Sequence, residues 1–458
     1  MIKNRSEVIK TPAHDIAIEC IEAGITAAQP RRVIGHTVSV TGNTLHIEQQ
    51  SYDLGDYSEV LILGGGKAAG QMAEVLESLL SDHLTGGVVV TNDPTETSHV
   101  TMFEGNHPVP DENGVAGAER LLELAEQAGE RTLILTVITG GGSALLPAPA
   151  GTISLADLQT VTNDLLASGA TIHEINVLRK HISKLKGGQL ARVAAPATVV
   201  GLTVSDVVGD DLDVIASGPL VPDTSTFQDA IDIIDVYGLS VPESIDEYLT
   251  AGIDGEIPET PDPSETFFEA VHNHVLANGR TALEAARDVA QQRGYETFMI
   301  SSRIRGEASE VAKTYAAVAE EIQATETPIG PPAVVLAGGE TTVTLQGNGH
   351  GGPNQELALS GGLELSDGNV VVASVDTDGL DGASDAAGAV VDCETAVPSD
   401  EARSALANND VYPFLDDSEA LVYTGPTGTN VNDIHVVVIE KDDERLQGND
   451  RAHTGRSK

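Results

Sequence analysis

Three short stretches of the chain place glycines and a charged or hydroxyl side chain directly after an apolar run. The apolar runs cover residues 60–63, 132–138 and 334–337, and their composition predicts buried parallel strands. The residues that follow them are Gly64, Gly65, Gly66 and Lys67, then Gly140, Gly141, Gly142 and Ser143, and finally Gly338, Gly339 and Glu340. Backbone N–H groups in such turns bind anions, so the three turns predict loops that converge on one phosphate-rich ligand.

We expect the Lys67 ammonium to bind a phosphate or a carboxylate as a point charge. The alternative is an ordinary surface lysine without a role in binding. Residues 64–69 also fit the G-x-G-x-x-A pattern of dinucleotide-binding folds, but no acidic residue closes the second strand about 20 residues further on. The P-loop spacing G-x-x-x-x-G-K-[ST] and the hydrolase spacing G-x-S-x-G do not occur at these turns. We therefore expect an anion-binding turn, with a dinucleotide site as the less favoured interpretation.

Cationic side chains gather in one segment of a chain that is otherwise strongly acidic. The sequence has 25 Lys and Arg residues against 70 Asp and Glu residues. Arg179, Lys180, Lys184 and Lys186 nevertheless follow one another within a few positions. In such a chain the cluster favours an anionic ligand over its alternative, a solvated helix face.

Carboxylates follow a further predicted strand at residues 197–204. Asp206 and Asp210 come just after it, and side chains at the end of a strand can bind Mg²⁺ or accept a proton. In the second half of the chain, Asp378 lies in a glycine-containing turn, and Asn354 and Glu356 begin a predicted helix. We expect these three residues at the edge of a ligand-binding cleft.

The elements around these residues alternate between strands and helices. Helical patterns at 68–80, 115–128 and 154–167 separate predicted strands at 60–63, 88–90, 133–138 and 197–204. This order predicts an α/β fold with a doubly wound, Rossmann-like sheet, which binds ligands at the carboxyl ends of its strands. A Pro- and Asp-containing stretch, 222–265, predicts a boundary between an N-terminal domain at 1–240 and a smaller α/β C-terminal domain at 265–440, before a flexible polar tail at 441–458.

The composition limits the partners and the location that we expect. A net charge of −45 argues against nucleic acid and against an anionic membrane as partners. The two cysteines lie far apart, and no apolar run approaches the roughly 18 residues of a membrane span, so we expect a cytoplasmic protein. Acidic residues spread along the chain, with few lysines, indicate a salt-adapted (halophilic) protein, an ordinary acidic enzyme being the alternative.

Several of these motifs, taken in order along the chain, resemble the signature blocks of the class II glycerate 2-kinases. The resemblance covers roughly residues 12–440. The blocks are Gly66 to Ala69, Asn106 to Asp111, Gly140 to Leu145, Asn176 to Gly188, Ser205 to Pro219, Gly339 to Val343, Gly352 to Glu356 and Gly425 to Asp433.

The resemblance implies a kinase that uses ATP and Mg²⁺ to phosphorylate D-glycerate to 2-phosphoglycerate in a cleft between its two domains. In an in-line phosphoryl transfer, Lys67 would neutralise charge on the transferred phosphoryl group. Arg179 would clamp the glycerate carboxylate, and Asp206 or Asp210 would hold Mg²⁺ or accept the hydroxyl proton. The remaining substrate and phosphate ligands would be Gly65, Gly66, Gly140, Gly141, Gly142, Ser143, Lys180, Asn354 and Glu356.

Gly338, Gly339, Glu340 and Asp378 would bind the nucleotide. One position departs from the family pattern, because Pro353 stands where the family commonly has arginine, and Arg179 or Lys180 would then supply the missing cation. Two other functions stay open: an NAD(P)H-dependent hydroxypyruvate reductase, a name that some family members carry, and a non-catalytic nucleotide-binding regulator. A homodimer also stays open.

Overall fold

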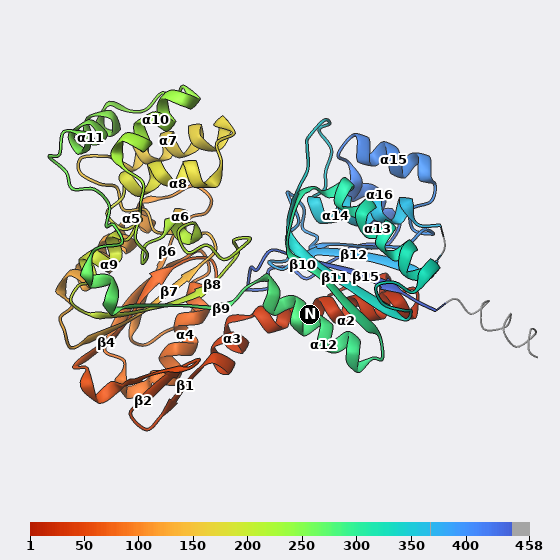
Figure 1. Ribbon diagram of the computed structural model, residues 1–458, viewed down its shortest axis with the longest axis horizontal. Helices are drawn as coiled ribbons and strands as arrows, with labels where there is room; N and C mark the ends of the chain where they lie inside the picture. Colours follow the sequence, from red (N-terminus) through yellow and green to blue (C-terminus); the bar gives the residue numbers. More distant parts are fainter. Residues whose placement is uncertain (367, 442–458) are drawn as a thin grey trace, which may run out of the picture. The chain divides into compact units, whose positions relative to one another are not determined.

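The computed structural model describes residues 1–366 and 368–441 and has the expected α/β architecture (Figure 1). The chain forms two compact units. One consists of Pro30–Asn278, and the other combines Met1–Gln29 with the described residues from Gly279 onward.

The central sheet of the unit Pro30–Asn278 is six-stranded and parallel throughout, in the order β6-β5-β4-β7-β8-β9. Its strands are β4 (Glu59–Gly65), β5 (Gly86–Thr91), β6 (Val100–Glu104), β7 (Thr132–Thr139), β8 (Thr198–Val204) and β9 (Val271–Ala277). The chain enters at β4, builds outward to β6, and then returns to add β7, β8 and β9 on the other side. This is the predicted doubly wound fold, and the strand order reverses between β4 and β7, which is where such sheets bind ligands.

Burial of apolar strand residues against helices holds this sheet together. Every residue of β7 is buried. Leu61 and Leu63 of β4 share a core cluster with Leu121 of α5 (Glu112–Gln127) and Leu190 of α9 (Gln189–Ala194). Strand β4 continues through Gly64 and Gly65, which the sequence placed in the turn, so only Gly66 and Lys67 follow the strand. Helix α4 (Ala69–Leu80) begins just after them and packs on β4, β5 and β7. The glycine turns after β4 and β7 are therefore anchored in the most buried part of the sheet.

A group of helices with its own apolar core lies at one end of the same unit (Figure 1). Its helices are α7 (Leu155–Ser168), α8 (Ile172–His181), α10 (Phe227–Tyr237) and α11 (Glu243–Ile253). Phe227, Ile245 and Leu249 are buried in that core, so the stretch at 222–265 is a packed part of this unit and the predicted boundary there is not seen. Thr226 caps α10 through a reciprocal bond pair with Asp229, which explains how an acidic stretch forms a helix.

Smaller elements complete this unit. Strands β1 (Val38–Thr41) and β2 (Thr44–Ile47) form a hairpin, and β3 (Gln50–Asp53) extends it into an antiparallel sheet. The other short elements are α3 (Pro30–Thr37), α6 (Gly142–Leu145), η1 (Leu54–Asp56), η2 (Ser81–His83), η3 (Ile215–Ser217) and η4 (Thr266–Ala270).

The second unit is built on a mixed six-stranded sheet in the order β10-β11-β15-β12-β13-β14. Strands β10 and β11 are parallel and the other pairs are antiparallel. The strands are β10 (Glu296–Glu307), β11 (Ala333–Thr342), β12 (Val370–Asp376), β13 (Gly388–Val391), β14 (Leu421–Val422) and β15 (Asp433–Ile439). Its helices are α1 (Arg5–Val8), α2 (Pro12–Ala28), α12 (Gly279–Gln292), α13 (Ala308–Thr325), α14 (Pro353–Glu364), α15 (Ser399–Ala407) and α16 (Val411–Asp417).

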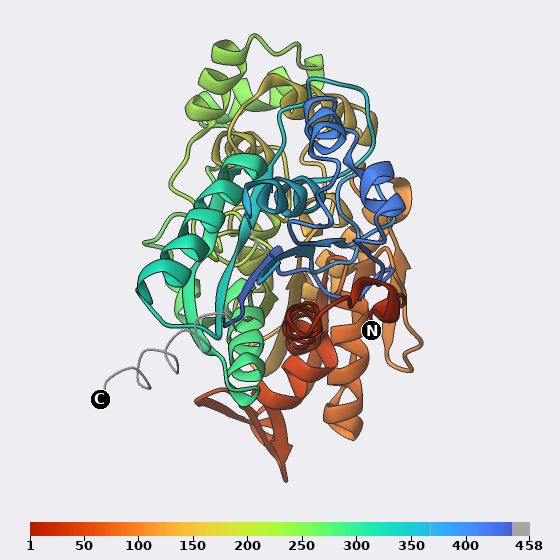
Figure 2. The same ribbon diagram turned by 90° about the vertical axis from the view of Figure 1, so that its right-hand side faces the viewer.

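The N-terminal helix belongs to this second unit, which differs from the predicted domain at 1–240. Helix α2 lies beside α12 and packs on β12 and β15 (Figures 1 and 2). It buries Ile18, Ile21 and Ile25 completely, and apolar periodicity alone does not say which sheet such a face will cover. The first unit also ends later than predicted, at Asn278 instead of residue 240, because β9 belongs to its sheet. All but the first residue of the predicted tail, 441–458, lies outside the described residues.

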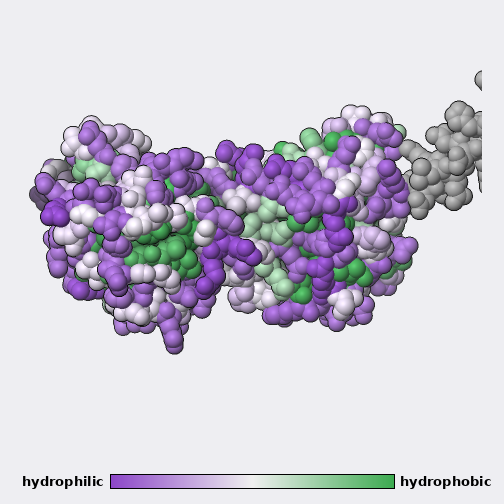
Figure 3. Space-filling model, turned by 90° about the horizontal axis from the view of Figure 1, so that it is seen from below, coloured by the Kyte–Doolittle hydropathy of each residue, from purple (hydrophilic) through white to green (hydrophobic). Residues whose placement is uncertain are grey.

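The surface reflects the composition. Hydrophilic residues cover most of the face shown in Figure 3. Among the residues that the structure describes, none of the helices combines the length and the apolar character that crossing a membrane requires.

Candidate active site

The first two glycine turns touch each other at the switch point of the parallel sheet. Gly140 follows β7, and its carbonyl accepts a hydrogen bond from the backbone N–H of Lys67 at 2.8 Å. The hydroxyl of Thr139 accepts the N–H of Ala68 at 3.1 Å. Gly66 has a φ of +138°, and a Cβ there would lie 2.2 Å from the Thr139 Oγ1, so only glycine fits.

Three ionisable side chains surround the turn from Gly140 to Gly141. A Cβ atom on Gly140 would lie 2.0 Å from Oδ2 of Asp206. A Cβ atom on Gly141 would lie 3.0 Å from Cδ2 of His107 and 3.2 Å from Cγ of Lys67. The structure therefore brings together the predicted residues Lys67 and Asp206, from the ends of different strands. His107 was not among the predicted site residues, and its only signal was its place in the block Asn106 to Asp111.

A chain of hydrogen bonds fixes the hydroxyl of Ser143. Ser143 Oγ lies 2.8 Å from Ser217 Oγ, and the Ser217 hydroxyl donates to Oδ1 of Asn176 at 2.9 Å. Ser217 has a positive φ of 62° and is fully buried. A buried residue held in this sparsely populated backbone region indicates that its position is specified by the surroundings. Sequence reasoning missed Asn176 and Ser217 as site residues because their roles depend on this contact.

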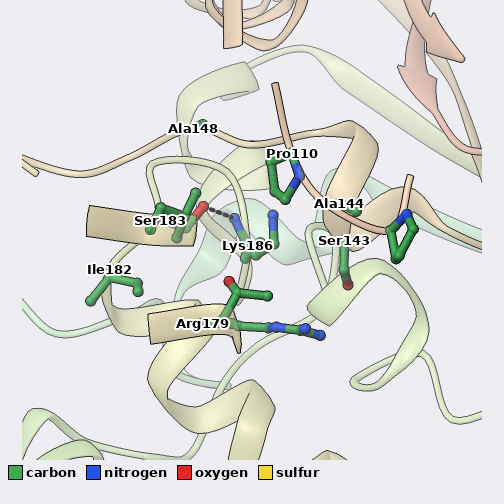
Figure 4. Close-up of a pocket in the computed structure, with 11 residues that line it drawn as sticks. Pro110, Ser143, Ala144, Ala148, Arg179, Ile182, Ser183 and Lys186 are labelled. Carbon is green, nitrogen blue, oxygen red and sulfur yellow. Dashed lines mark hydrogen bonds between the residues drawn. The ribbon is translucent and has the colours of Figure 1, made fainter. Parts of the chain in front are cut away.

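Beside this network, Ser143, Arg179 and Lys186 line a pocket with a cavity volume of about 20 Å³ (Figure 4). The other lining residues are Pro108, Pro110, Ala144, Ala148, Leu158, Thr162, Ile182 and Ser183. Figure 4 shows the Arg179 side chain extending toward Ser143. The Lys186 ammonium donates to the carbonyl of Leu146 at 2.8 Å, and the backbone N–H of Lys186 donates to Ser183 Oγ at 3.2 Å.

Burial changes the acid–base properties of both cations. Lys186 is only 5% exposed, and loss of hydration, with a smaller contribution from the positive charge of Arg179, lowers its pKa to about 7. Burial also lowers the pKa of Arg179. The sequence placed Lys186 in the cationic cluster, but did not separate it from its neighbours.

Lys180, predicted to bind substrate or phosphate, has a different environment. Its ammonium is buried and forms ion pairs with Asp213 and, at 3.3 Å, with Asp223. Two carboxylates thus already neutralise this cation, which ties α8 to the segment after β8. Of the four clustered cations, Arg179 and Lys186 line the pocket, whereas Lys184 is exposed.

The predicted metal ligands Asp206 and Asp210 differ in their surroundings. Asp210 has a φ of +61° and accepts a hydrogen bond from the Asn278 side chain at 2.8 Å. In the described part of the chain, His, Cys, Asp and Glu side chains form no group of three or more that could hold a metal ion. Mg²⁺ commonly uses one or two carboxylates together with substrate phosphates and water, so the Asp206 carboxylate at the glycine turn fits such an ion.

In the second unit, the third glycine motif is not a turn, which corrects the prediction made for Gly338, Gly339 and Glu340. Strand β11 continues through all three residues to Thr342. Gly339 has a φ of +149°, and a Cβ there would lie 2.1 Å from the carbonyl oxygen of Ile304 in β10. Glycine is needed at this position because β10 approaches β11 closely where the register between the two strands is irregular. An apolar run followed by Gly-Gly in the sequence does not reveal such an approach.

Asn354 and Glu356 lie in the first turn of α14, where Pro353 occupies the first helical position. Asn354 Nδ2 donates to Oδ1 of Asp433 at 2.7 Å, and Glu356 accepts from the side chain of Asn409 at 3.0 Å. Proline is favoured at this position because its missing N–H would have no helical partner, so the backbone accommodates Pro353 here.

Asp378 belongs to a group of carboxylates at the end of β12. Its backbone N–H donates to Oδ1 of Asp376 at 2.9 Å. Burial, followed by the charges of Asp378 and Asp433, raises the pKa of Asp376 well above its ordinary value. Burial also raises the pKa of Asp381 to about 7, against hydrogen bonds from Asn354 and Gln355. These groups favour cations or shared protons at this edge of the sheet.

Comparisons with known proteins agree with this architecture. Two family models match the chain: a domain of unknown function (DUF4147) over residues 16–250, and the MOFRL family over residues 333–433. The chain is 38% identical to a glycerate 2-kinase of Pyrococcus horikoshii, over 94% of this chain and 98% of that protein. A D-glycerate 2-kinase of Thermotoga maritima is also 38% identical, over 93% of this chain and 98% of its own.

A putative hydroxypyruvate reductase of Agrobacterium vitis is 39% identical over 83% of this chain and 87% of its own. The crystal structure of a glycerate kinase from Thermotoga maritima superposes with a TM-score of 0.82 at 37% identity, over 93% of this chain and 99% of that one. Similarity of this extent covers both units and the turns that carry Lys67 and Ser143. The chain belongs to the glycerate kinase family.

Proposed function

We propose that this protein is a glycerate 2-kinase, which transfers a phosphoryl group from ATP to D-glycerate and forms 2-phosphoglycerate. The observation that carries the proposal is the pair of touching glycine turns at the switch point, with Lys67 and Asp206 around them. Phosphoryl transfer requires positioning and neutralisation of charge rather than a protein nucleophile. A cation and a carboxylate at one anion-binding turn supply those two requirements.

Each side chain has a role that follows from its position. Lys67 neutralises the negative charge that spreads over the oxygens of the transferred phosphoryl group. The backbone from Gly140 to Ser143 holds phosphate or glycerate, because the first N–H groups of a helix have no partner within it. Arg179 binds the glycerate carboxylate. Asp206 accepts the proton of the attacking hydroxyl or, with phosphate oxygens and water, binds Mg²⁺, which when present neutralises phosphate charge.

For the second unit, we propose that residues around Gly338, Gly339, Glu340 and Asp378 contribute to nucleotide binding. The support is the close strand packing that Gly339 permits and the carboxylates at the end of β12, which is separated from β11 by the single strand β15. In the first unit, we propose Asp210, which accepts a hydrogen bond from Asn278, as the alternative to Asp206 for binding Mg²⁺ or accepting the proton.

The direct test is D-glycerate-dependent release of ADP, measured with purified protein, ATP and Mg²⁺ in molar KCl. L-glycerate and hydroxypyruvate serve as comparison substrates. Turnover with D-glycerate supports the kinase. Oxidation of NADH or NADPH in the presence of hydroxypyruvate, without release of ADP, would contradict the kinase proposal. It would instead support the reductase activity for which the Agrobacterium vitis relative is named.

We further propose that the protein is adapted to high salt and acts in the cytoplasm. The support is the net charge of −45 and the predominantly hydrophilic face in Figure 3. Mutual repulsion of so many carboxylates destabilises the compact state at low ionic strength, and salt screens it.

A further inference from the structure

Among the described residues that line the pocket beside Ser143 are one buried cation, Lys186, and one partly buried cation, Arg179, and no acidic side chain. Its lining consists of Arg179, Lys186, three hydroxyl residues and apolar groups. Within residues 1–366 and 368–441, no carboxylate forms an ion pair with Arg179 or Lys186. Lys180, a few residues away, has two such partners. The difference indicates that an anionic ligand supplies the counter-charge for the two cations that line the pocket.

The physical reason is the cost of burying charge. A cation removed from water loses several kcal/mol of hydration unless an anion or hydrogen-bond acceptors replace it. Lys186 has one protein acceptor, the Leu146 carbonyl, and has Arg179 as a like-charged neighbour. The cavity of about 20 Å³ admits one or two water-sized groups, so it suits a carboxylate and is far too small for a nucleotide.

We propose that Lys186 is the second cation of the carboxylate subsite for the small 2-hydroxy acid substrate, because it lines one small pocket together with Arg179 and Ser143. Arg179 supplies the permanent charge and Lys186 the proton-dependent one, while Ser143 anchors the acid toward the glycine turn. The inference rests on the proposed function for the identity of the acid, D-glycerate.

The groups that face Lys186 determine how binding of the acid depends on pH. Among the described lining residues, Arg179 on α8 is the other charged group, and the hydroxyls of Ser143, Thr162 and Ser183 stay neutral in this range. None of these described lining residues is a carboxylate that could compete for the ammonium. A bound carboxylate therefore favours protonated Lys186, so affinity is greatest below pH 7 and falls above it, by about tenfold for each pH unit once Lys186 is mainly neutral.

The test is calorimetric titration of the protein with D-glycerate, without nucleotide, at several pH values from 6 to 9. Lactate and inorganic phosphate are titrated alongside, because lactate keeps the carboxylate and the 2-hydroxyl group. The variants are Lys186→Met, which removes the charge, and Lys186→Arg, which keeps a charge that does not titrate. Lys184→Met is the matched control, since Lys184 is exposed in the same segment.

We expect the parent and Lys184→Met to lose at least about tenfold in affinity for D-glycerate and lactate between pH 7 and 9, because Lys186 deprotonates. Lys186→Met should bind weakly at every pH, and Lys186→Arg should bind with little pH dependence. Pocket-dependent binding of phosphate but not of lactate would overturn the carboxylate assignment. An unchanged pH profile in Lys186→Arg would overturn the role of Lys186.

Failure of the two proposals can be told apart. If the parent protein binds lactate with the predicted pH profile but shows no D-glycerate-dependent ADP release, the pocket stands and the kinase proposal fails. If the protein is an active kinase whose D-glycerate affinity is independent of Lys186, the kinase stands and this inference fails. Far-UV circular dichroism of each variant confirms that a loss of binding is measured on folded protein.

Discussion

Replacing Lys186 by methionine should make the ligand-free protein more stable near neutral pH. Methionine has a similar length and no charge, so it fills the same buried space without the cost of dehydrating an ammonium group. The structure gives the size of this cost, because burial and Arg179 lower the pKa of Lys186 from 10.5 to about 7.

The sign follows from proton binding. Between pH 7 and about 10, the unfolded chain carries a protonated Lys186 and the folded protein a neutral one, so unfolding takes up a proton. The destabilisation due to this lysine is therefore complete below pH 7 and disappears as pH rises toward the ordinary pKa of lysine. One pKa unit corresponds to about 1.36 kcal/mol, so the full cost approaches about 5 kcal/mol.

Loss of the hydrogen bond to Leu146 offsets part of the gain by about 1 kcal/mol, at every pH alike. The difference in slope is therefore the sharper observable. Between pH 7.5 and 9.5, the unfolding free energy of the parent should rise relative to that of Lys186→Met by about 1.4 kcal/mol per pH unit.

Urea unfolding in molar KCl, followed by circular dichroism at each pH, measures this slope. All other titrating groups are common to both proteins and cancel in the difference. Lys184→Met should follow the parent, because Lys184 is exposed. Parallel pH profiles for the parent and Lys186→Met would refute the conclusion that this ammonium is buried without a counter-charge.

Three further predictions concern the active site and the surface. Lys67→Ala should lower kcat by about 10²–10³-fold with D-glycerate and ATP, because the lysine charge that faces the transferred phosphoryl group is lost. Lys184→Ala should leave kcat unchanged. A change in kcat of less than threefold in Lys67→Ala would show that Lys67 has no part in the mechanism. Gly140→Ala places a Cβ 2.0 Å from Asp206 Oδ2 and should lower kcat by about 10²-fold. Gly129→Ala, where the new Cβ has no atom within 4 Å, should leave kcat unchanged. Equal kcat values for the parent and Gly140→Ala would contradict the packing of Asp206 on this turn. The melting temperature should rise as KCl increases from low to molar concentration, and a flat profile in scanning calorimetry would contradict salt adaptation.

Strand-to-glycine patterns were sufficient to predict the parallel sheet and the place of its first two turns, although β4 continues through Gly64 and Gly65 and the first turn begins only at Gly66. The runs before Gly64 and Gly140 are mostly apolar because both faces of the strands are covered, and this signal is local. The same pattern misled at Gly338, where the glycines serve the approach of β10. A turn and a close strand contact both require glycine, so the sequence does not distinguish them.

Contacts between distant segments could not be predicted in the same way. The periodicity of α2 shows that one face is apolar, but not that this face packs on α12 and β15. Lys180 and Lys186 look equivalent in sequence. Only the fold places Asp213 and Asp223 beside Lys180 and leaves Lys186 facing a pocket without a carboxylate.

The most direct test of the proposed function is a ³¹P NMR time course with D-glycerate, ATP and Mg²⁺ in molar KCl. We expect the ATP resonances to decline while a new phosphomonoester resonance grows and co-resonates with added 2-phosphoglycerate. The 3-phosphoglycerate resonance would keep the kinase but contradict the position of transfer. Unchanged ATP in the presence of D-glycerate, with protein shown to be folded, would contradict the kinase itself.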